Sequence, residues 1–498
     1  MSKIEIKHLN FSYDGQIDPL FTDANLNIDI SWKLGLVGRN GRGKTTLLKL
    51  LQNQLPFTGT ITHQLTLTYF PQTVSNPQQL TYYALNELAD FQQWELEREL
   101  NLLGVDLDCL WREFATLSGG EQTKVLLALL FLDPASFPLI DEPTNHLDYA
   151  ARKQVAQYLQ KKKQGFIVIS HDRRFIDEVC DHLIAIEKNQ LALYQGNYTT
   201  YLTEKEQQDQ FELAENQKLQ KEIGRLKKTA KDKSDWSMSR ESDIHGNPLI
   251  KGSGGTGHAG AVTARAARVM KRSKAIEGRM ERQITEKEKL LKNLEFIDPL
   301  KMLFAPTHHE ILFQVENLQL FYEDKPLFEP LNFTLKKGER LALVAPNGYG
   351  KSSLLQALLG TFPGKITGTI LRPQNINSSY VRQIYTDNRG LLPAFATANG
   401  LDYETFLSNL KKLGMERAVF TNVIEKMSLG QQKKVELAKS LSVPSELYVW
   451  DEALNYLDLY NHQQLEAVIQ ATQPTMLLVD HDADFIEKIG AKEVHLIR

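Results

Sequence analysis

The feature that most constrains the fold is a duplication: one set of short motifs occurs twice, in the same order. The first copy contains GRNGRGKT at 38–45, and the second contains APNGYGKS at 345–352. Six marker residues of the first copy have counterparts 307 to 311 positions later, namely Tyr13 and Tyr322, Lys44 and Lys351, Gln72 and Gln383, Ser118 and Ser428, Asp141 and Asp451, and His171 and His481. Six ordered matches at one spacing indicate an internal repeat of two complete domains.

Each copy contains a glycine-rich loop of the kind that binds phosphate. The first matches G-x-x-x-x-G-K-[ST] and lies between an apolar strand-like run at 34–37 and a helix-like run at 47–51. Glycines let backbone N–H groups approach the phosphates, Lys44 is expected to meet the outer phosphates, and Thr45 offers a hydroxyl to Mg²⁺. The predicted nucleotide-binding residues of the two loops are Gly38, Asn40, Gly41, Gly43, Lys44, Thr45 and Thr46, and Asn347, Gly348, Gly350, Lys351, Ser352 and Ser353.

Two acidic residues end an apolar strand in each copy. In FPLIDEPTNHLD, Asp141 is predicted to hold Mg²⁺ and Glu142 to polarise the attacking water. The predicted catalytic residues are Glu142, His171, Glu452 and His481. The predicted metal-binding residues are Thr45, Gln72 and Asp141 in the first copy, and Ser352, Gln383 and Asp451 in the second. Tyr13 and Tyr322 are predicted platforms for the base of the nucleotide.

Together with the segments LSGGEQ at 117–122 and MSLGQQ at 427–432, these motifs resemble those of the ATP-binding cassette family. The resemblance implies two α/β cassettes that face each other head to tail, with each ATP between the phosphate loop of one and the signature segment of the other. The first ATP site would then include Ser428, Gly430 and Gln431, and the second would include Ser118, Gly119 and Gly120. The implied cofactors are ATP and Mg²⁺.

Both copies depart from the family pattern. Leu429 replaces the first signature glycine, Ala345 and Pro346 change the start of the second loop, Tyr349 stands at a position where a small residue is usual, and Ala453 replaces a proline after Glu452. We therefore expect two binding sites with unequal hydrolysis rates. The sequence leaves open which site is faster.

The region between the copies is predicted to form an antiparallel α-helical hairpin, or coiled coil. Residues 203–240 and 264–294 are polar and helix-favouring, with narrow apolar seams. The first seam comprises Leu219, Ile223, Leu226 and Ala230. Six glycines and Pro248 fall within 246–260, where the chain must reverse. The predicted domains are thus 1–202, a first cassette; 203–300, a linker with its tip near 241–262; and 301–498, a second cassette.

The middle of the chain is basic. Between Lys218 and Lys274 there are fourteen Lys and Arg but five Asp and Glu, a net charge of +9, whereas the whole chain carries −3. Five of the basic residues, Arg265, Arg268, Lys271, Arg272 and Lys274, lie close together in ARAARVMKRSK. Such a segment can follow phosphate backbones and indicates contact with nucleic acid. The alternative is a solvated helical face on a simple spacer.

Two cassettes joined by a charged helical hairpin, with no membrane domain, resemble the ABC-F family of ribosome-associated ATPases. Segments such as WELERELNLLGV, WSMSRE and LGMERAVFTN are similar to those of its Lsa-type antibiotic-resistance members. This resemblance implies a monomer that binds the tRNA exit site of the 70S ribosome with ATP bound. Its linker would approach the peptidyl-transferase centre, near 23S rRNA and tRNA in the P site, and displace lincosamide, pleuromutilin and streptogramin A antibiotics.

There are three alternatives, one within the same family and two from other protein classes. The first is a drug-independent ABC-F factor that relieves stalled ribosomes. Many such factors carry an extra helical arm between the positions of Gln72 and Ser118. The nearly equal spacings Gln72–Ser118 and Gln383–Ser428 leave no room for that arm here. A fused transporter ATPase leaves the basic hairpin without a role. A zinc-bearing DNA-repair protein needs cysteine clusters, which two cysteines cannot form. The longest apolar run, Val125–Leu132, is too short to span a membrane, and we expect a cytoplasmic protein.

Overall fold

The computed structural model describes residues 3–14, 19–145, 147–187, 189–245, 279 and 298–497; for residue 230 and residues 233–245 it describes the backbone alone. Residues 1–201 and 297–498 form one unit, and residues 202–296 form a second. Within the first unit we call the part up to residue 201 the first cassette and the part from residue 298 the second cassette.

The first cassette is built on a six-stranded sheet with the order β5-β6-β7-β3-β8-β9. Its strands are β3 (Lys33–Val37), β5 (Thr66–Phe70), β6 (Ser136–Asp141), β7 (Phe166–Ile169), β8 (His182–Glu187) and β9 (Gln190–Gln195). All neighbours are parallel except β8 and β9. The central strands are nearly continuous runs of buried apolar residues, as expected for parallel strands covered on both faces.

An antiparallel sheet and a set of helices complete the first cassette. The sheet has the order β2-β1-β4, with β1 (Lys3–Phe11), β2 (Phe21–Asp29) and β4 (Thr58–Thr62). The helices are α1 (Lys44–Leu51), α2 (Thr81–Asn86), α3 (Gln93–Leu102), η1 (Leu107–Trp111), η2 (Phe114–Thr116), α4 (Gly119–Leu130), α5 (Tyr149–Lys161) and α6 (Arg173–Val179).

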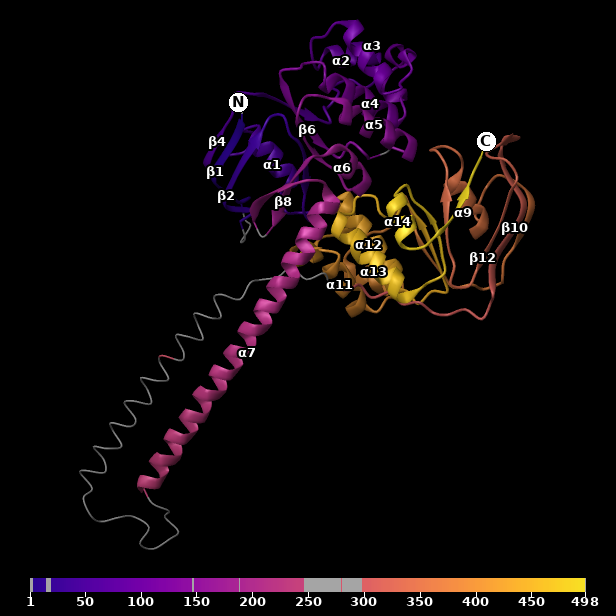
Figure 1. The fold of residues 1–498 in the computed structure, drawn as a ribbon. Helices are drawn as coiled ribbons and strands as arrows, with labels where there is room; N and C mark the ends of the chain where they lie inside the picture. Colours follow the sequence, from indigo (N-terminus) through magenta and orange to yellow (C-terminus); the bar gives the residue numbers. More distant parts are fainter. Residues whose placement is uncertain are drawn as a thin grey trace. The chain divides into compact units, whose positions relative to one another are not determined.

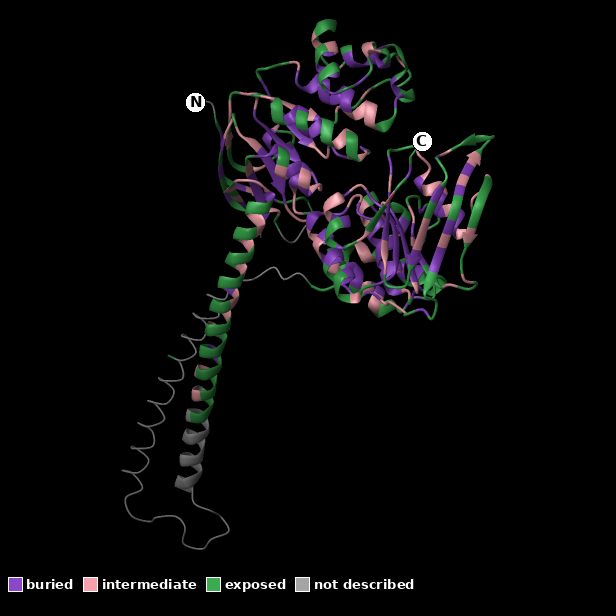
Figure 2. Cartoon of the chain, turned by 45° about the vertical axis from the view of Figure 1, so that its right-hand side comes forward, coloured by how far each residue is buried: buried purple, intermediate pink, exposed green. Residues whose placement is uncertain are grey.

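The second cassette repeats this architecture. Its parallel sheet has the order β15-β16-β17-β13-β18, with β13 (Arg340–Val344), β15 (Ser378–Val381), β16 (Leu447–Asp451), β17 (Met476–Val479) and β18 (Lys492–His495). Each strand occupies the place of its counterpart in the first cassette. The predicted duplication is therefore confirmed at the level of strand order. In Figure 2 the central strands of this sheet are largely purple, because apolar residues of both faces are buried.

The remaining elements of the second cassette also follow the first. An antiparallel sheet contains β10 (Ile311–Tyr322), β11 (Lys325–Pro326), β12 (Leu331–Lys336) and β14 (Lys365–Leu371). The helices are α9 (Lys351–Leu359), α10 (Leu392–Ala398), α11 (Tyr403–Lys412), η3 (Arg417–Thr421), η4 (Ile424–Lys426), α12 (Leu429–Ser442), α13 (Leu459–Thr472) and α14 (Ala483–Lys488).

One long helix begins the segment between the cassettes. Helix α7 (Tyr198–His245) has 48 residues and is uninterrupted in Figure 1; at 1.5 Å per residue it is about 72 Å long. Ile223 is buried, and Leu219 and Leu226 are half-buried, so the predicted apolar seam forms one face of this helix. The helix continues beyond Arg240, where the helical sequence pattern ends, into the predicted tip region. The rest of the tip and nearly all of the predicted second arm lie outside the described residues.

A buried ion pair in the second cassette gives a first prediction. Glu436 on α12 is fully buried, and its carboxylate accepts hydrogen bonds from Arg382 Nε at 2.9 Å and Asn388 Nδ2 at 2.7 Å. Changing Arg382→Met removes the cation that is hydrogen-bonded to this carboxylate and leaves only Lys439, at 3.7 Å, so we expect the free energy of unfolding to fall by about 3 kcal/mol. Chemical unfolding of the full chain measures this. The control Lys492→Met removes an exposed pair with Glu339 and should cost less than about 1 kcal/mol; equal effects of the two changes would contradict the prediction.

Candidate functional site

The predicted site residues converge because their strands are neighbours. The phosphate loop follows β3, Asp141 ends β6, and His171 lies two residues beyond β7, while the three strands are adjacent and parallel in the order β6-β7-β3. Their carboxyl ends therefore meet at one edge of the sheet, where open α/β sheets bind ligands. The same order, β16-β17-β13, brings together Asp451, His481 and the second loop.

The first phosphate loop holds a buried ammonium group among backbone and amide oxygens. Lys44 Nζ donates to the carbonyl of Gly38 at 2.9 Å and to Asn40 Oδ1 at 3.1 Å. Burial lowers the pKa of Lys44, with Asp458 and Glu142 opposing this effect. Gly43 has a φ of +92°, and a Cβ there would lie 3.1 Å from the Phe21 ring, so the loop needs glycine at this position. This concave, cationic loop at the start of α1 fits a phosphate group.

The acidic end of β6 places a carboxylate beside a hydroxyl. Asp141 Oδ2 accepts hydrogen bonds from Thr45 Oγ1 at 2.7 Å and from the Tyr69 hydroxyl at 3.0 Å. Glu142 Oε1 lies 3.0 Å from His171 Nε2. Burial raises the pKa of Glu142 to about 8, against the opposing effect of Lys44, and burial lowers the pKa of His171 well below its ordinary value.

Glu142 and Glu452 share an unusual backbone conformation. Their φ angles are +55° and +49°, in the left-handed region that residues other than glycine seldom adopt. Their backbone N–H groups donate to Ile169 and Val479, the last residues of β7 and β17. Strained backbone held by its surroundings at the same point of both repeats is typical of functional positions.

The second site has the same set of groups with different contacts. Lys351 Nζ donates to the carbonyls of Ala345 at 2.8 Å and Pro346 at 3.1 Å. Glu452 Oε2 accepts from Gln383 Nε2 at 3.0 Å and from Asn455 Nδ2 at 2.8 Å. The distance from His481 Nε2 to Glu452 Oε1 is 3.7 Å, longer than its counterpart in the first site.

A cavity of about 430 Å³ lies at the first site. The predicted residues that line it are Tyr13, Asn40, Gly41, Gly43, Lys44, Thr45, Thr46, Asp141, Glu142, His171 and Gly430. Gly430 comes from the second cassette, so both cassettes contribute to this cavity. Four residues predicted for this site, Gly38, Gln72, Ser428 and Gln431, do not line it.

The two signature serines cap the helices that follow them. Ser118 Oγ accepts the N–H of Glu121, whose carboxylate accepts the N–H of Ser118, and Ser428 forms the same reciprocal pair with Gln431. Gly119 and Gly120 begin α4 directly after its cap. Leu429, which stands where the first signature glycine is expected, is 58% exposed.

The remaining predicted residues of the second cassette occupy corresponding elements. Ser352 and Ser353 lie in the first turn of α9, next to Gly350, whose φ is +84°. Gly348 also has a positive φ, and Asn347 donates its N–H toward Asp148 of the first cassette at 3.4 Å. Tyr322 ends β10, is 42% exposed and contacts the Phe362 ring.

The oxygen atoms at both sites fit Mg²⁺. Asp451 Oδ1 and Gln72 Oε1 are buried side-chain oxygens without a hydrogen-bond donor, and the Ser352 hydroxyl bonds the Asp451 carboxylate. Hydroxyl and carboxylate oxygens are the ligands that Mg²⁺ takes. Among the described residues no group of three His, Cys, Asp or Glu side chains could by itself hold a metal.

Sequence reasoning missed two aspartates that reach across to the opposite cassette. Asp458 Oδ2 accepts the backbone N–H of Asn40 at 2.7 Å, and Asp148 Oδ2 faces the N–H of Asn347. The duplication could have indicated them, because each aspartate stands seven residues after the predicted Mg²⁺-binding aspartate of its own copy, in the matching segments NHLD and NYLD. Tyr69 and Asn455, which bond Asp141 and Glu452, were also missed.

The comparisons with known proteins agree with this duplicated site. A family model described as ABC transporter matches the chain twice, over residues 21–145 and 328–455, and a second model with that description matches residues 184–242. The "ABC transporter F family member 5" of Arabidopsis thaliana is 26% identical over 98% of the chain and 74% of its own length. The chain belongs to the ABC-F family of ATPases. This confirms the expected family, the α/β fold of two cassettes and the expected ATPase activity.

Other proteins also align along nearly the whole chain. The "Ribosome protection protein VmlR" of Bacillus subtilis is 29% identical over 96% of this chain and 84% of its own length. The "ATP-binding protein Uup" of Buchnera aphidicola is 27% identical over 94% of the chain and 76% of its own length. A solved structure of the archaeal ribosome recycling factor aABCE1 with the stalk protein aP1 matches 98% of the chain, with a TM-score of 0.63 at 18% identity and 87% coverage of that structure. At this identity the structural match supports the fold alone.

None of the helices in the described part of the chain is both long enough and apolar enough to cross a membrane.

Proposed function

We propose that this ABC-F ATPase binds the tRNA exit site of the 70S ribosome with ATP bound and protects the peptidyl-transferase centre from lincosamide, pleuromutilin and streptogramin A antibiotics. The observation that carries the proposal is similarity to a ribosome protection protein across 96% of the chain, including the segment between the cassettes. Helix α7 supports it further, because a 48-residue helix is far more than a spacer between domains needs.

In this proposal ATP binds between the cassettes and its hydrolysis resets the protein. Lys44 and Lys351 contact the outer phosphates, and Thr45, Gln72 and Asp141, with their counterparts Ser352, Gln383 and Asp451, hold Mg²⁺. When bound, Mg²⁺ would supply positive charge that neutralises the phosphate oxygens of ATP. Glu142 and Glu452 accept the proton of the attacking water, and His171 and His481 orient them. The signature residues of the opposite cassette complete each site.

The proposed partner is the ribosome, with 23S rRNA and tRNA in the P site next to the linker, and the protein acts as a cytoplasmic monomer with two pseudo-symmetric halves. The alternative is a drug-independent ABC-F factor that relieves stalled ribosomes. Both functions predict ATP-dependent ribosome binding, so only drug susceptibility separates them. A transporter ATPase would instead sediment with membranes.

The ribosome-binding part of the proposal can be tested through its dependence on salt. Arg265, Arg268, Lys271, Arg272 and Lys274 lie outside the described residues, and we propose that they contact RNA phosphates. Each lost phosphate contact is expected to reduce the slope of log affinity against log salt by about 1. We therefore expect R265Q/R268Q/K271Q to flatten the slope by about 3 in co-sedimentation with ribosomes at several salt concentrations.

A matched control changes three basic residues of the described part of α7 that are nearer the cassette, namely K218Q/K221Q/R225Q. If both triple variants keep the wild-type slope, the basic segment is a solvated helical face. If only the control variant has a reduced salt slope, the RNA phosphates are contacted by the described part of α7 and not by the ARAARVMKRSK segment.

A further inference from the structure

The two cassettes meet around the segments that follow His171 and His481, which we call the switch histidines and switch segments. Because of the repeat, each contact there can be compared with its counterpart. Within each cassette the residue after the histidine pairs with the helix that precedes it in the chain, α5 or α13: Arg152 Nη1 lies 3.2 Å from Asp172, and His462 Nδ1 lies 3.5 Å from Asp482. These two pairs occupy equivalent positions, 310 residues apart. The contacts of the next residue, Arg173, are not repeated.

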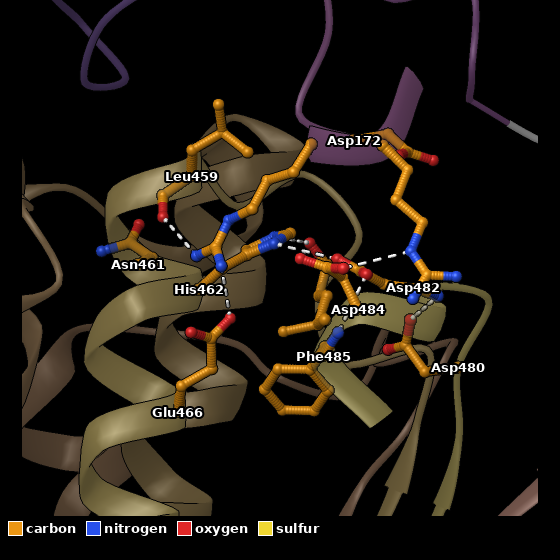
Figure 3. Close-up of polar contacts among 12 residues, drawn as sticks. Asp172, Leu459, Asn461, His462, Glu466, Asp480, Asp482, Asp484 and Phe485 are labelled. Atoms are coloured by element: carbon orange, nitrogen blue, oxygen red, sulfur yellow. Dashed lines mark hydrogen bonds and ion pairs between the residues drawn. The ribbon is translucent and has the colours of Figure 1, made fainter. Parts of the chain in front are cut away.

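Arg173 forms a buried ion pair across the cassette boundary. Its side chain is 4% exposed, and its Nη1 lies 2.8 Å from Oε1 of Glu466 on α13. Its Nη2 donates to the carbonyl of Leu459, at the start of the same helix, at 3.4 Å. Figure 3 shows Leu459 and Glu466 one above the other along α13. Arg173 is two residues beyond His171, so this pair attaches α13 of the second cassette to the switch segment of the first ATP site.

The same helix also contacts the phosphate loop of the first site. Asp458, which caps α13, accepts the N–H of Asn40 at 2.7 Å, and the carbonyl of Tyr456 accepts from Asn40 Nδ2 at 3.1 Å. The Arg39 guanidinium lies 3.7 Å above the ring centre of Tyr460. Helix α13 thus contacts the first site at two separate points, the phosphate loop and the switch segment.

The second site cannot form the equivalent contacts. The counterparts of Arg173 and Glu466 are Ala483 and Ala156, which carry no charge. Both alanines line a small cavity of about 80 Å³ at this place. The counterparts of Arg39 and Tyr460 are Pro346 and Ala150, which cannot form a cation–π pair. Both sites have a hydrogen bond between the loop asparagine and an aspartate of the other cassette. At the second site this bond is longer, at 3.4 Å between Asn347 N and Asp148 Oδ2.

We propose that α13 is a one-sided brace: the Arg173–Glu466 pair holds the first ATP site closed, so that this site releases nucleotide more slowly than the second. The inference rests on the proposed ATP sites and adds which of them opens first. A close, desolvated charge pair across an interface mainly slows separation, and truncating one partner speeds it, because the remaining charge is left without its counterion. Arg173 and Glu466 act here as positioning residues, since neither lines the first-site cavity.

The release of nucleotide from each site can be measured separately. The full chain carrying E142Q/E452Q, which should retain ATP without hydrolysis, is loaded with a radiolabelled photoreactive ATP analogue and chased with unlabelled ATP. Crosslinking at successive times, followed by peptide mapping, assigns the remaining label to the peptide that contains Tyr13 or to the one that contains Tyr322. We expect the first-site label to persist longer than the second-site label.

Four variants in this background test the brace. E466Q and R173M should speed release from the first site roughly tenfold or more and leave the second site nearly unchanged. The charge exchange R173E/E466R should restore slow release. A156E/A483R, which installs the pair at the second site, should slow release there. The matched control R174A removes a more exposed cross-cassette pair with Asp484 and Glu487 and should have little effect.

The possible results distinguish failure of the Arg173–Glu466 brace from failure of the proposed ATP sites. Absence of nucleotide-dependent label at both peptides would overturn the proposed ATP sites themselves. Label at both peptides with equal release rates would overturn the brace and leave the sites intact. Unchanged first-site release in E466Q would also overturn it. If E466Q or R173M fails to fold, the other two variants still decide. Equal release from both sites in R173E/E466R, or second-site release at the wild-type rate in A156E/A483R, contradicts the proposal.

Discussion

The double change E142Q/E452Q is expected to lower ATP turnover by about 10²- to 10⁴-fold while ATP binding persists. Each glutamate follows the last residue of a buried strand, beside its switch histidine, and is held in the same left-handed backbone conformation in both repeats. Gln keeps the shape of the side chain but cannot accept the proton of the attacking water. Phosphate release measures turnover, and equilibrium binding of a fluorescent ATP analogue measures affinity.

The control for this prediction is E87Q/E404Q, which makes the same chemical change at one exposed position in each cassette. It should retain wild-type turnover. Near wild-type turnover in E142Q/E452Q would show that neither glutamate accepts the proton. Turnover that falls together with ATP binding would instead mean that the two residues support the nucleotide and not the chemical step.

Replacing residues 246–260 by a short Gly-Ser turn is expected to abolish antibiotic protection while ATP turnover and thermal stability stay close to wild type. Helix α7 ends at His245, and the replaced segment, with Leu249, Ile250, Lys251 and His258, lies outside the described residues. No cassette motif is touched, and loop tips tolerate such changes. Inhibitory concentrations of a lincosamide and a pleuromutilin, in cells that make equal amounts of each variant, measure protection.

A second replacement distinguishes the effect of the length of the tip from the effect of its side chains. A Gly-Ser segment of the same fifteen residues keeps the length and removes Leu249, Ile250, Lys251 and His258. If these side chains act on the drug site, both replacements lose protection, and single changes at Leu249, Ile250 or Lys251 alter the balance between drug classes more than ATP turnover. Full protection by the short version would place the protective contact elsewhere on the linker.

Much of each cassette could be predicted from local sequence. GRNGRGKT lies between a strand pattern and a helix pattern, and β3 and α1 form there because the loop, its glycines and its flanks are all contained in one short segment. The acidic pair after β6 and the histidine after β7 were predictable for the same reason. The duplication then supplied the second cassette, whose strand order repeats the first.

What the sequence did not indicate depends on contacts between distant segments. Arg173 and Glu466 are 293 residues apart, and nothing in either local pattern predicts their ion pair. The sequence also did not indicate that both signature serines cap their own helices, and their contact with ATP stays a prediction. The left-handed backbone at Glu142 and Glu452 was also unpredictable, because glutamate has no preference for it and the surrounding strands impose it.

The most direct test of the proposed function is drug susceptibility in a sensitive bacterium that expresses this protein. We predict raised inhibitory concentrations for a lincosamide, a pleuromutilin and a streptogramin A compound, with no change for an antibiotic that acts elsewhere on the ribosome. The E142Q/E452Q variant, made in equal amount, should give no resistance, because a protein that cannot hydrolyse ATP stays on the ribosome. Unchanged inhibitory concentrations for all three classes, with wild-type protein present and bound to ribosomes, would contradict a protective role and leave a drug-independent translation factor.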